Sequence, residues 1–411
     1  MKILNDENPL NRKVNRELLP FEMAFETAIG YAKFIGSETV SLQNSLGRIL
    51  AEDVISDVDM PPFNRAAMDG YACRYADIGN ELTVIEEIPA GTVPQHKIGE
   101  NQCAKIMTGA IVPEGADTVI MVEQTQKVDE NKIRFIGKDT VSNIAKKGED
   151  VEMGDTVLRS GMLIYPQHIG ILAALGKVKV SVAKKPIAAI IATGDEIVEP
   201  DEKPTLSQTR NVNSYELMAK IEQVGAEYKY YGLIGDDFEK IDKVFKTALE
   251  ECDLVIITGG VSMGDYDIVP QIFQKNSVEI LFDRIAIKPG RPTTFGVTAD
   301  KVIWGLPGNP VSTLISFELF VKPFLFKMMG HNYSPIKITL PLEQTVSRNK
   351  TARASWIPVK ITDSGKIRTI KYNGSGHIAS FVDADGVICI PRGVAKIEKD
   401  SLVDVRLFVC H

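Results

Sequence analysis

The segment DLVIITGG, residues 253–260, decides the fold of the chain, because its apolar core runs without interruption into two glycines. Such a run is typical of a strand that is buried on both faces and ends in a tight loop. Two comparable runs precede it, at Ile187–Ala192 and Tyr228–Ile234, and amphipathic helical patterns separate the three, at Asn213–Val224 and Asp237–Glu251. Strands that alternate with helices predict a parallel, doubly wound sheet.

Further segments are expected to extend this central domain. Short apolar pieces at Ile285–Ile287, Thr293–Val297 and Val302–Trp304 are predicted to join the sheet, and the helix that starts at Val311 closes it. Helical spacing also occurs at Leu19–Phe34, Ser45–Ala51 and Tyr165–Leu175.

The remaining patterns predict a multidomain α/β protein. Short β-like runs between glycines and prolines indicate a β-rich domain upstream, and strict alternation indicates a small β domain at the C-terminal end. The predicted parts are an N-terminal segment (1–25, its start expected to be disordered), a small helical linking domain (26–50 and 150–177), the β-rich domain (51–149), the α/β domain (178–330) and the C-terminal β domain (331–411).

Composition excludes several classes of protein. The 411 residues include 47 basic and 54 acidic side chains, a net charge of −7, which argues against general binding to nucleic acid or to an anionic membrane. The 5 cysteines form no CxxC pair, so neither a disulfide framework nor a structural zinc site is implied. The first residues contain no apolar signal-peptide core, and charged residues interrupt the longest apolar run, Val311–Met329. We therefore expect a cytoplasmic protein.

Ligands of open parallel sheets bind outside the carboxyl ends of the strands, and three suggestive loops occur there. They are Thr193-Gly194-Asp195-Glu196, Asp236-Asp237 and residues 259–267. In the third loop, Gly259 and Gly260 allow backbone N–H groups to approach an anion, and Ser262 adds a hydroxyl. Carboxylates follow at Asp265 and Asp267, and they would repel a phosphate unless a cation lay between. This combination favours phosphate chemistry bridged by Mg²⁺.

Each of these loops also has a purely structural interpretation. The third can be a glycine-rich turn with acidic helix caps, the first can be a simple turn, and Asp236-x-x-Glu239 matches a capping box. The turn Lys288-Pro289-Gly290-Arg291-Pro292 presents two cations on a stiff backbone, which suits an oxyanion but equally suits a solvated surface. Asn309 and Pro310 can begin a helix as N-cap and first residue, or can direct N–H groups at a ligand.

Elsewhere, spacing alone favours structural turns. PPFNRAAMDGYA (61–72), MTGA (107–110) and KGED (147–150) lie in the β-rich region. The segment GSGHIA (374–379) fits a dinucleotide pattern but lacks the strand and helix that such a fingerprint requires.

Taken together, the segments resemble the molybdopterin molybdenumtransferase (MoeA) family, whose eukaryotic relatives include the gephyrin E domain. The resemblance runs from about residue 20 to the C-terminus and rests on nine motifs in the family's order. They are PPFNRAAMDGYA, MTGA, KKGEDV, ATGDEIVEP, RNVNSYEL, DD (236–237), TGGVSMGDYD, KPGRPTTFG and GLPGNPVS.

The resemblance implies an activity and partners. Such enzymes insert molybdenum from molybdate into adenylylated molybdopterin and release AMP, with Mg²⁺ as the required cation. The implied protein is an elongated homodimer of four-domain subunits with a MogA-like central domain. Its cleft combines the loops at the sheet end of one subunit with the Asp69 region of the other. A molybdopterin adenylyltransferase would act upstream.

The resemblance also assigns roles to individual residues. Asp236 and Asp267 would hold the metal, and Lys288 and Arg291 would receive molybdate. The implied catalytic residues are Asp69, Thr108, Asp150, Glu196, Asp236 and Asp267. The implied substrate- and nucleotide-binding residues are Thr193, Gly194, Asp195, Gly259, Gly260, Ser262, Asn309, Pro310 and Ser312. The implied molybdate-binding residues are Lys288, Arg291, Pro292, Arg353 and Ser375.

Two features depart from the family pattern. Asn64 and Ala66 stand where many members have Asp and Ser, and Arg291 stands where many have Lys. Two other functions remain open at this point: a hydrolase of another adenylylated substrate, and a dimeric scaffold of the gephyrin type. The acidic loops at the strand ends favour the enzyme, because a scaffold does not need carboxylates there.

Overall fold

A computed structural model describes residues 18–260, 268–371, 374 and 376–408. The chain divides into two compact units, each described here by itself. Unit 1 contains the residues up to Thr39, Gly47–Ala51 and the residues from Ser181 onward, and unit 2 contains Val40–Leu46 and Glu52–Val180. Within the described ranges, no helix has the length and apolar content needed to cross a bilayer.

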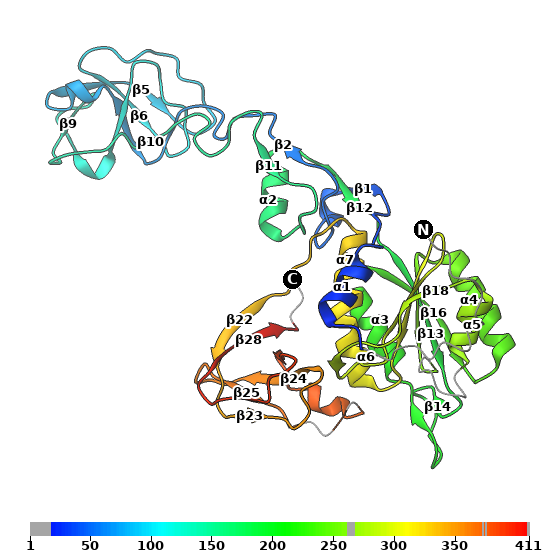
Figure 1. Cartoon of the computed structure of the whole chain (residues 1–411). Helices are drawn as coiled ribbons and strands as arrows, with labels where there is room; N and C mark the ends of the chain where they lie inside the picture. Colours follow the sequence, from blue (N-terminus) through cyan, green and yellow to red (C-terminus); the bar gives the residue numbers. More distant parts are fainter. Residues whose placement is uncertain (1–17, 261–267, 372–373, 375, 409–411) are drawn as a thin grey trace, which may run out of the picture. The chain divides into compact units, whose positions relative to one another are not determined.

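The first part of unit 1 is built on a six-stranded sheet (Figure 1). In spatial order its strands are β16 (Glu227–Ile234), β13 (Ile187–Thr193), β17 (Leu254–Thr258), β21 (Val302–Leu306), β20 (Thr294–Val297) and β18 (Glu279–Phe282). The four strands from β16 to β21 are parallel, which confirms the predicted doubly wound core. Strand β20 runs antiparallel to β21, and the edge strand β18, which was not foreseen, runs antiparallel to β20.

The prediction that Ile285–Ile287 joins this sheet is wrong. Strand β19 (Ile287–Lys288) pairs instead with β24 (Ala354–Ile361) of the C-terminal β domain. The strand is short because the chain turns at Gly290, whose φ is 100°. A strand of two residues has no sequence period that could reveal its partner.

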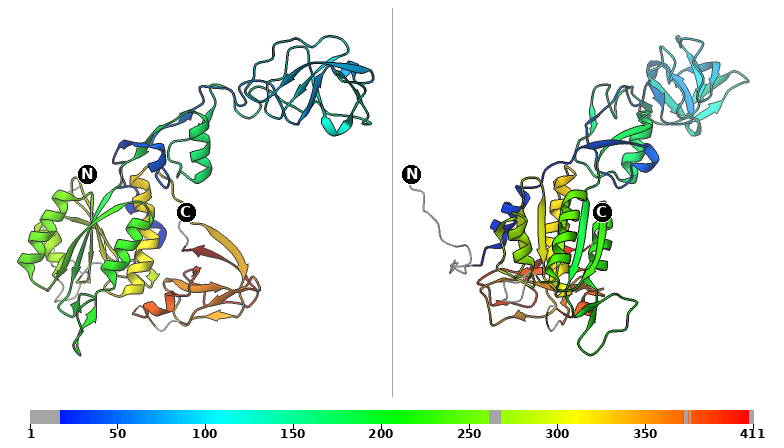
Figure 2. Two further views of the ribbon diagram at one scale, coloured as in Figure 1. Left: turned by 180° about the vertical axis from the view of Figure 1, so that it is seen from behind. Right: turned by 90° about the vertical axis from the view of Figure 1, so that its right-hand side faces the viewer.

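Helices cover both faces of the sheet, as Figures 1 and 2 show: α4 and α5 on one face, α3, α6 and α7 on the other. The helices of unit 1 are α1 (Phe21–Ile29), α3 (Asn213–Gln223), α4 (Phe238–Glu251), α5 (Val269–Lys275), α6 (Pro310–Ser316) and α7 (Lys322–Met328). The core on the α4 side consists of strand residues such as Ile257 packed against Phe245 and Phe273, whose rings lie 5.6 Å apart.

The long apolar segment after Pro310 is not one continuous helix. A π-helical turn, η5 (Phe317–Val321), separates α6 from α7. Pro323 explains the change, because proline has no N–H for the preceding turn and disfavours regular α-helix there. The predicted late break is therefore confirmed, and it begins a few residues before the proline.

The C-terminal β domain contains a sheet with the order β19-β24-β26-β28-β22, and β25 pairs with β24. The further strands are β22 (Lys337–Pro341), β25 (Ile367–Thr369), β26 (Gly386–Ile390) and β28 (Leu402–Leu407), with a separate pair, β23 (Val346–Ser347) and β27 (Lys396–Ile397). Its core includes Val359, Ile388 and Val405, each at most 1% exposed.

Unit 2 contains the predicted β-rich domain. Its sheet consists of β7 (Thr118–Met121), β4 (Gly70–Cys73), β6 (Gln102–Ile106), β5 (Glu81–Ile88), β9 (Lys132–Phe135) and β8 (Thr125–Lys127), in this order. Small ladders are formed by β3 (Arg65–Ala66) with β10 (Ile144–Ala145) and by β2 (Val54–Ile55) with β11 (Thr156–Leu158). The helix α2 spans Pro166–Ala174.

The chain passes between the units along β1 (Ser37–Ser41) and β12 (Lys179–Ala183), which pair with each other. A helix over Ser45–Ala51 was expected here and is wrong. Only Leu42–Asn44 forms a 3₁₀ turn, and Leu50 makes a bridge to Val182. Gly47, with φ of 73°, lies in the left-handed region and ends any helical course.

Candidate functional site

The loops of interest follow adjacent parallel strands. In the sheet register, Thr193 lies opposite Ile234, Ala192 lies opposite Thr258, and Thr258 lies opposite Leu306. The last residues of β13, β16, β17 and β21 are Thr193, Ile234, Thr258 and Leu306, respectively. The loops that begin at Gly194, Gly235, Gly259 and Pro307 therefore emerge side by side, at the edge where ligands of such sheets bind.

The glycine loop after β17 packs directly on the loop after β13. A Cβ on Gly259 would lie 2.1 Å from the Thr193 carbonyl oxygen, and φ at Gly259 is 90°. Gly260 has φ of 56° and lies close to the Thr193 hydroxyl. Only glycine satisfies both the close approach and the backbone conformation. The residues 261–267, with Ser262, Asp265 and Asp267, lie outside the described part of the chain.

Asp195 and Asp236 lie next to each other on two loops, because Asp195 Oδ1 accepts a 3.0 Å hydrogen bond from the Asp236 N–H. Glu196 turns back over the first loop. The Glu196 carboxylate lies close to Gly194. A Cβ atom on Gly194 would be 2.8 Å from Glu196 Oε2. A cluster of acidic side chains thus lines the ends of β13 and β16.

The capping box predicted at Asp236-x-x-Glu239 is wrong by one residue. Asp237 is the N-cap of α4, and its Oδ1 accepts a 3.1 Å hydrogen bond from the Lys240 N–H. This bond and the Lys240 ammonium, 3.2 Å away, hold the pKa of Asp237 below its ordinary value. Asp237 supplies the cap, so capping of α4 does not account for Asp236.

Asn309 begins helix α6 but does not cap it through its side chain. It stands at the N-cap position before Pro310, and its side chain makes no capping hydrogen bond. Its carbonyl oxygen accepts from the Ser312 N–H at 2.9 Å. The preceding Gly308 lies against Gly259, with the Gly259 Cα 3.9 Å from where a Gly308 Cβ would be. The Asn309 side chain therefore does not cap α6, and the Gly308 segment packs against the glycine loop.

Sequence reasoning missed one residue at this site, Asn213. Its Nδ2 donates 2.8 Å hydrogen bonds to the Thr258 hydroxyl and to the Gly308 carbonyl. The only signal in the sequence was a polar residue at the first position of the helix that follows the β13 loop. A short polar residue at a helix start is ordinarily a cap, so its contacts with two distant loops could not be foreseen.

The cationic turn is anchored to helix α6. Thr293 Oγ1 donates to the Gly290 carbonyl at 2.8 Å and lies 2.7 Å from the Ser316 hydroxyl, near the end of α6. Lys288 and Arg291 on this turn are exposed, and Pro292 between them and Thr293 is partly buried. The turn therefore presents both cations to solvent from a fixed backbone.

Arg353 lies beside this turn. Its Nη1 donates a 3.4 Å hydrogen bond to the carbonyl of Ile287, and the following residue, Ala354, pairs with Ile287 in the β19–β24 ladder. A third cation predicted for molybdate thus lies immediately before β24, the strand that pairs with Lys288. Ser375 lies outside the described residues.

The three site residues predicted in the β-rich region belong to unit 2. Thr108 donates two 2.7 Å hydrogen bonds to Asp69 Oδ1, one from its N–H and one from its hydroxyl. Asp150 lines an open cavity of about 860 Å³, with Asp59, Arg65 and Glu149 among the other lining residues. Spacing had favoured plain turns here, whereas the Asp69–Thr108 pair is a defined polar group.

Two of the residues that depart from the family pattern, Asn64 and Ala66, have structural roles in unit 2. Asn64 Oδ1 accepts a 2.9 Å hydrogen bond from the Lys147 N–H, which ties the PPFN segment to the KKGED turn. Ala66 is 1% exposed and packs in an apolar cluster with Ala72 and Ile106. An amide and a methyl group are therefore used here for local structure.

Comparison with known proteins identifies the family. The model of the MoeA N-terminal region (domain I and II) matches residues 19–176, a probable molybdopterin binding domain matches residues 189–327, and the MoeA C-terminal region (domain IV) matches residues 343–408. The molybdopterin molybdenumtransferase of Staphylococcus epidermidis is 38% identical over 379 residues, 90% of either chain. The chain belongs to the molybdopterin molybdenumtransferase family.

Other members of the family support the same assignment. The molybdopterin molybdenumtransferase of Staphylococcus aureus is 34% identical over 403 residues, covering 95% of this chain and 96% of the relative. Among solved structures, the molybdopterin biosynthesis MoeA protein of Pyrococcus horikoshii OT3 is 34% identical, with a TM-score of 0.84 over 95% of this chain and 100% of its own.

The resemblance to the molybdopterin molybdenumtransferase family implies a bound Mg²⁺, and the described side chains at the strand ends suit that ion. In the ranges that the structure describes, no group of three or more His, Cys, Asp or Glu side chains is arranged to hold a metal. Mg²⁺ needs no such group, because it is commonly held by one or two carboxylates together with substrate phosphates and water. Asp195 and Asp236, joined by their 3.0 Å hydrogen bond, supply carboxylates of that kind.

Proposed function

We propose that this chain inserts molybdenum from molybdate into adenylylated molybdopterin, with release of AMP in a Mg²⁺-dependent step in the cytoplasm. The observation that carries the proposal is the meeting of four ligand-type loops at the strand ends of a domain whose family model is a molybdopterin binding domain. Membership of the molybdopterin molybdenumtransferase family supports the same reaction.

The strand-end loops have the chemistry to hold the phosphates of the substrate. Gly259 and Gly260 bring backbone N–H groups to the loop surface without side chains in the way, and Asn309 leads into the N-terminus of α6. Exposed N–H groups bind anions, and glycine permits the close approach. Thr193, Gly194 and Ser312 complete this lining, and Ser262 belongs to the same loop by sequence.

The carboxylates are proposed to hold the metal. Asp236, next to Asp195, and Asp267 would bind Mg²⁺, with Glu196 close by. When bound, Mg²⁺ supplies positive charge that offsets the negative charge on the phosphates during cleavage. The side chains themselves would orient the substrate.

Molybdate is proposed to bind at the cationic turn. Lys288 and Arg291 project from a turn that Thr293 fixes to helix α6, and Arg353 lies immediately before the neighbouring strand β24. A tetrahedral oxyanion gains most from cations whose positions are set in advance. Pro292 and the Ser375 segment are assigned to the same site by the family resemblance.

The active protein is proposed to be a homodimer with composite clefts. Asp69, Thr108 and Asp150 of one subunit would complete the site formed by the strand-end loops of the other. A molybdopterin adenylyltransferase would supply the adenylylated substrate. The net charge of −7 gives no support for a nucleic-acid or membrane partner.

Neighbouring aspartates offer a matched pair of variants for testing the function. Purified protein is incubated with adenylylated molybdopterin, molybdate and Mg²⁺, and AMP release and cofactor formation are followed. We expect Asp236→Asn to reduce Mg²⁺-dependent release by about 100-fold, because a charge that offsets the cation is lost. Asp237→Asn is the control, since asparagine caps a helix as well as aspartate does.

The outcomes separate two claims. If the wild-type protein forms no molybdenum-containing cofactor and releases no AMP, the proposed reaction is rejected. If the wild type is active and Asp236→Asn retains full turnover, only the metal role of Asp236 is rejected.

A further inference from the structure

Asn213 links two of the strand-end loops. The residue begins helix α3 and is 9% exposed. One amide nitrogen serves both loops, with 2.8 Å hydrogen bonds to the Thr258 hydroxyl, immediately before Gly259, and to the Gly308 carbonyl, immediately before Asn309. Along the chain, Asn213 lies 45 residues from Thr258 and 95 residues from Gly308. A single side chain thus joins loops that local sequence cannot join.

The orientation of the amide follows from chemistry. The Gly308 carbonyl can only accept a hydrogen bond, so the group that faces it must be the NH₂ of Asn213. The two N–H groups are then both used, and Oδ1 points elsewhere. Oδ1 is buried and has no hydrogen-bond partner among the described residues.

The link also continues beyond Asn213. The Thr258 hydroxyl lies 3.5 Å from the Pro307 carbonyl, and the Thr313 hydroxyl donates to the same carbonyl at 2.5 Å. The Pro307-Gly308 segment is therefore held from β17, from α3 and from α6. Loops held in this way present their N–H groups in a fixed geometry before the ligand arrives, which is what binding and catalysis of an anion require.

The unpartnered oxygen indicates a missing donor. Buried polar atoms in native proteins are nearly all hydrogen-bonded, and an exception at a ligand site calls for a partner. Phosphate and molybdate oxygens carry no donor at neutral pH, so they cannot supply it. The organic part of an adenylylated pterin carries N–H and O–H groups that can.

We propose that Asn213 is a positioning residue that holds the Gly259-Gly260 and Gly308-Asn309 loops together, and that its Oδ1 accepts a hydrogen bond from an N–H or O–H group of the adenylylated pterin. The second part rests on the proposed function, whereas the first part concerns the ligand-free protein. The residue acts on the phosphates through the loops and on the organic moiety directly.

The test compares two asparagines at the same helix end. Asn211 is 4% exposed, and its side chain bonds to the Tyr230 hydroxyl and the Ser214 N–H but to neither loop. Binding of adenylylated molybdopterin to the full-length protein is measured by calorimetry for wild type, Asn213→Ala and Asn211→Ala. We expect Kd to rise by about 10- to 100-fold for Asn213→Ala and by less than about threefold for Asn211→Ala.

A second measurement tests the loop link without substrate. Hydrogen exchange at Gly259-Gly260 and Gly308-Asn309 should become faster in Asn213→Ala and in Thr258→Val, and should stay near wild type in Asn211→Ala and Thr258→Ser. Thr258→Val removes the hydroxyl but keeps the shape of the side chain, whereas Thr258→Ser keeps a hydroxyl at this position. In turnover assays, Thr258→Val should lower kcat more than it raises KM. The variant weakens the link that positions the two loops, whereas Oδ1 of Asn213, the proposed contact to the pterin, is still present.

Each outcome decides one part of the inference. Unchanged loop exchange in Asn213→Ala overturns the positioning role, whatever the function of the protein. If wild type binds the adenylylated pterin and Asn213→Ala binds it equally well, or Asn211→Ala loses as much affinity, the contact to substrate is overturned. If wild type itself does not bind that substrate, the proposed function fails together with the contact, and the exchange result still decides the positioning role.

Discussion

At the residue scale, the Asp69 carboxylate accepts two hydrogen bonds from Thr108, and they hold its pKa below the ordinary value. The side-chain bond is the larger cause. Buried cysteines behave in the opposite way, since burial raises the pKa of Cys73 and of Cys103 to about 12. The Asp69 carboxyl group is therefore an anion at neutral pH, whereas the two buried thiols stay protonated and contribute to packing.

The first prediction concerns the Asp69 pKa. Thr108→Val removes the hydroxyl that stabilises the carboxylate, so the Asp69 pKa should rise toward that of an ordinary aspartate. Carboxyl carbon shifts followed by NMR between pH 2 and 7 measure the change. Thr108→Ser keeps the hydroxyl and should titrate like wild type, and an unchanged pKa in Thr108→Val would show that the backbone bond alone sets the value.

The second prediction concerns molybdate. Lys288→Ala and Arg291→Ala each remove one exposed cation from the turn that Thr293 anchors, and each should weaken molybdate binding by about tenfold. Arg291→Lys preserves the charge and should lose much less, which separates charge from the planar geometry of the guanidinium. Calorimetric titration with molybdate measures these effects. Equal affinity in both alanine variants would remove the proposed oxyanion site.

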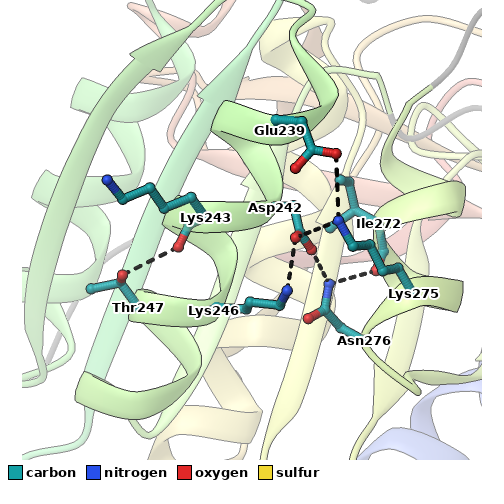
Figure 3. Close-up of polar contacts among 8 residues, drawn as sticks. All are labelled: Glu239, Asp242, Lys243, Lys246, Thr247, Ile272, Lys275 and Asn276. Atoms are coloured by element: carbon teal, nitrogen blue, oxygen red, sulfur yellow. Dashed lines mark hydrogen bonds and ion pairs between the residues drawn. The ribbon is translucent and has the colours of Figure 1, made fainter.

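At the element scale, charged side chains hold neighbouring helices in place. Figure 3 shows Asp242 of α4 facing Lys246 of the same helix and both Lys275 and Asn276 at the end of α5. Asp242 is 3% exposed and lies 2.8 Å from each lysine ammonium. The cluster joins α4 to α5, the helix that directly follows residues 261–267 in the chain.

The third prediction tests this cluster. Asp242→Ala should destabilise the protein by about 3 kcal/mol at pH 7, because two cations and an amide lose a buried partner. The bonds lower the pKa of Asp242, so its contribution is present above the pKa of the unfolded state and is lost as the pH falls through the folded value. Urea unfolding at pH 7 and pH 3 measures the difference, which should shrink in acid. Lys243→Ala, on the exposed side of α4, is the control and should change stability by less than about 0.5 kcal/mol.

A second group of charges joins α3 to the π-helical turn η5. Glu318 is 1% exposed and lies 2.8 Å from Lys220 of α3 and 3.3 Å from Lys322, and Arg406 donates to its backbone carbonyl. Glu216, one turn before Lys220, has a buried carboxylate oxygen without a hydrogen-bond partner. Burial is the main cause that raises the pKa of Glu216 to about 7.

The fourth prediction follows from this raised pKa. The folded state favours protonated Glu216, so its contribution to stability is fully present below the unfolded pKa and is lost as the pH rises toward 7. Glu216→Gln stays neutral, and its stability relative to wild type should increase by on the order of 2–3 kcal/mol between pH 4.5 and 8. Denaturant unfolding across this range measures the effect. The exposed Glu222→Gln on the same helix should follow the wild-type profile, and a parallel profile for Glu216→Gln would contradict the assignment.

At the scale of the whole molecule, the predicted site residues are divided between the two compact units. The strand-end loops and the cationic turn belong to unit 1, and Asp69, Thr108 and Asp150 belong to unit 2. The proposed homodimer would bring the two sets together from different subunits. A two-fold dimer would then have two equivalent composite clefts.

The fifth prediction tests this arrangement by complementation. Asp69→Ala and Glu196→Ala subunits, each inactive alone, are co-expressed with different tags, and the mixed dimer is purified. A composite cleft leaves one of the two sites intact, so the mixed dimer should have about half of the wild-type activity. Sites formed within single chains would leave both damaged and the dimer inactive. The homodimers of each variant are the controls.

The sequence by itself determined the parallel strands of the central domain, the helices α3 and α4 between them, and where each candidate loop follows its strand. Apolar runs such as Leu254–Thr258 and the amphipathic pattern of Phe238–Glu251 report burial directly, because burial repeats with the period of the element. The family motifs can likewise be recognised within short, continuous stretches of sequence. Short strands and the exact positions of helix breaks were less predictable, since a segment of two or three residues is too short to show a hydrophobic periodicity.

Only the tertiary structure decided which residues meet. It moved the α4 cap from Asp236 to Asp237, placed Ile287–Lys288 beside Ala354–Ser355, and gave Asn213 its two loop contacts. None of these follows from neighbouring residues, because a hydrogen bond between Asn213 and Gly308 depends on how the whole sheet stacks its strands. Periodicity describes one element at a time, whereas a binding site is made where the ends of several elements converge.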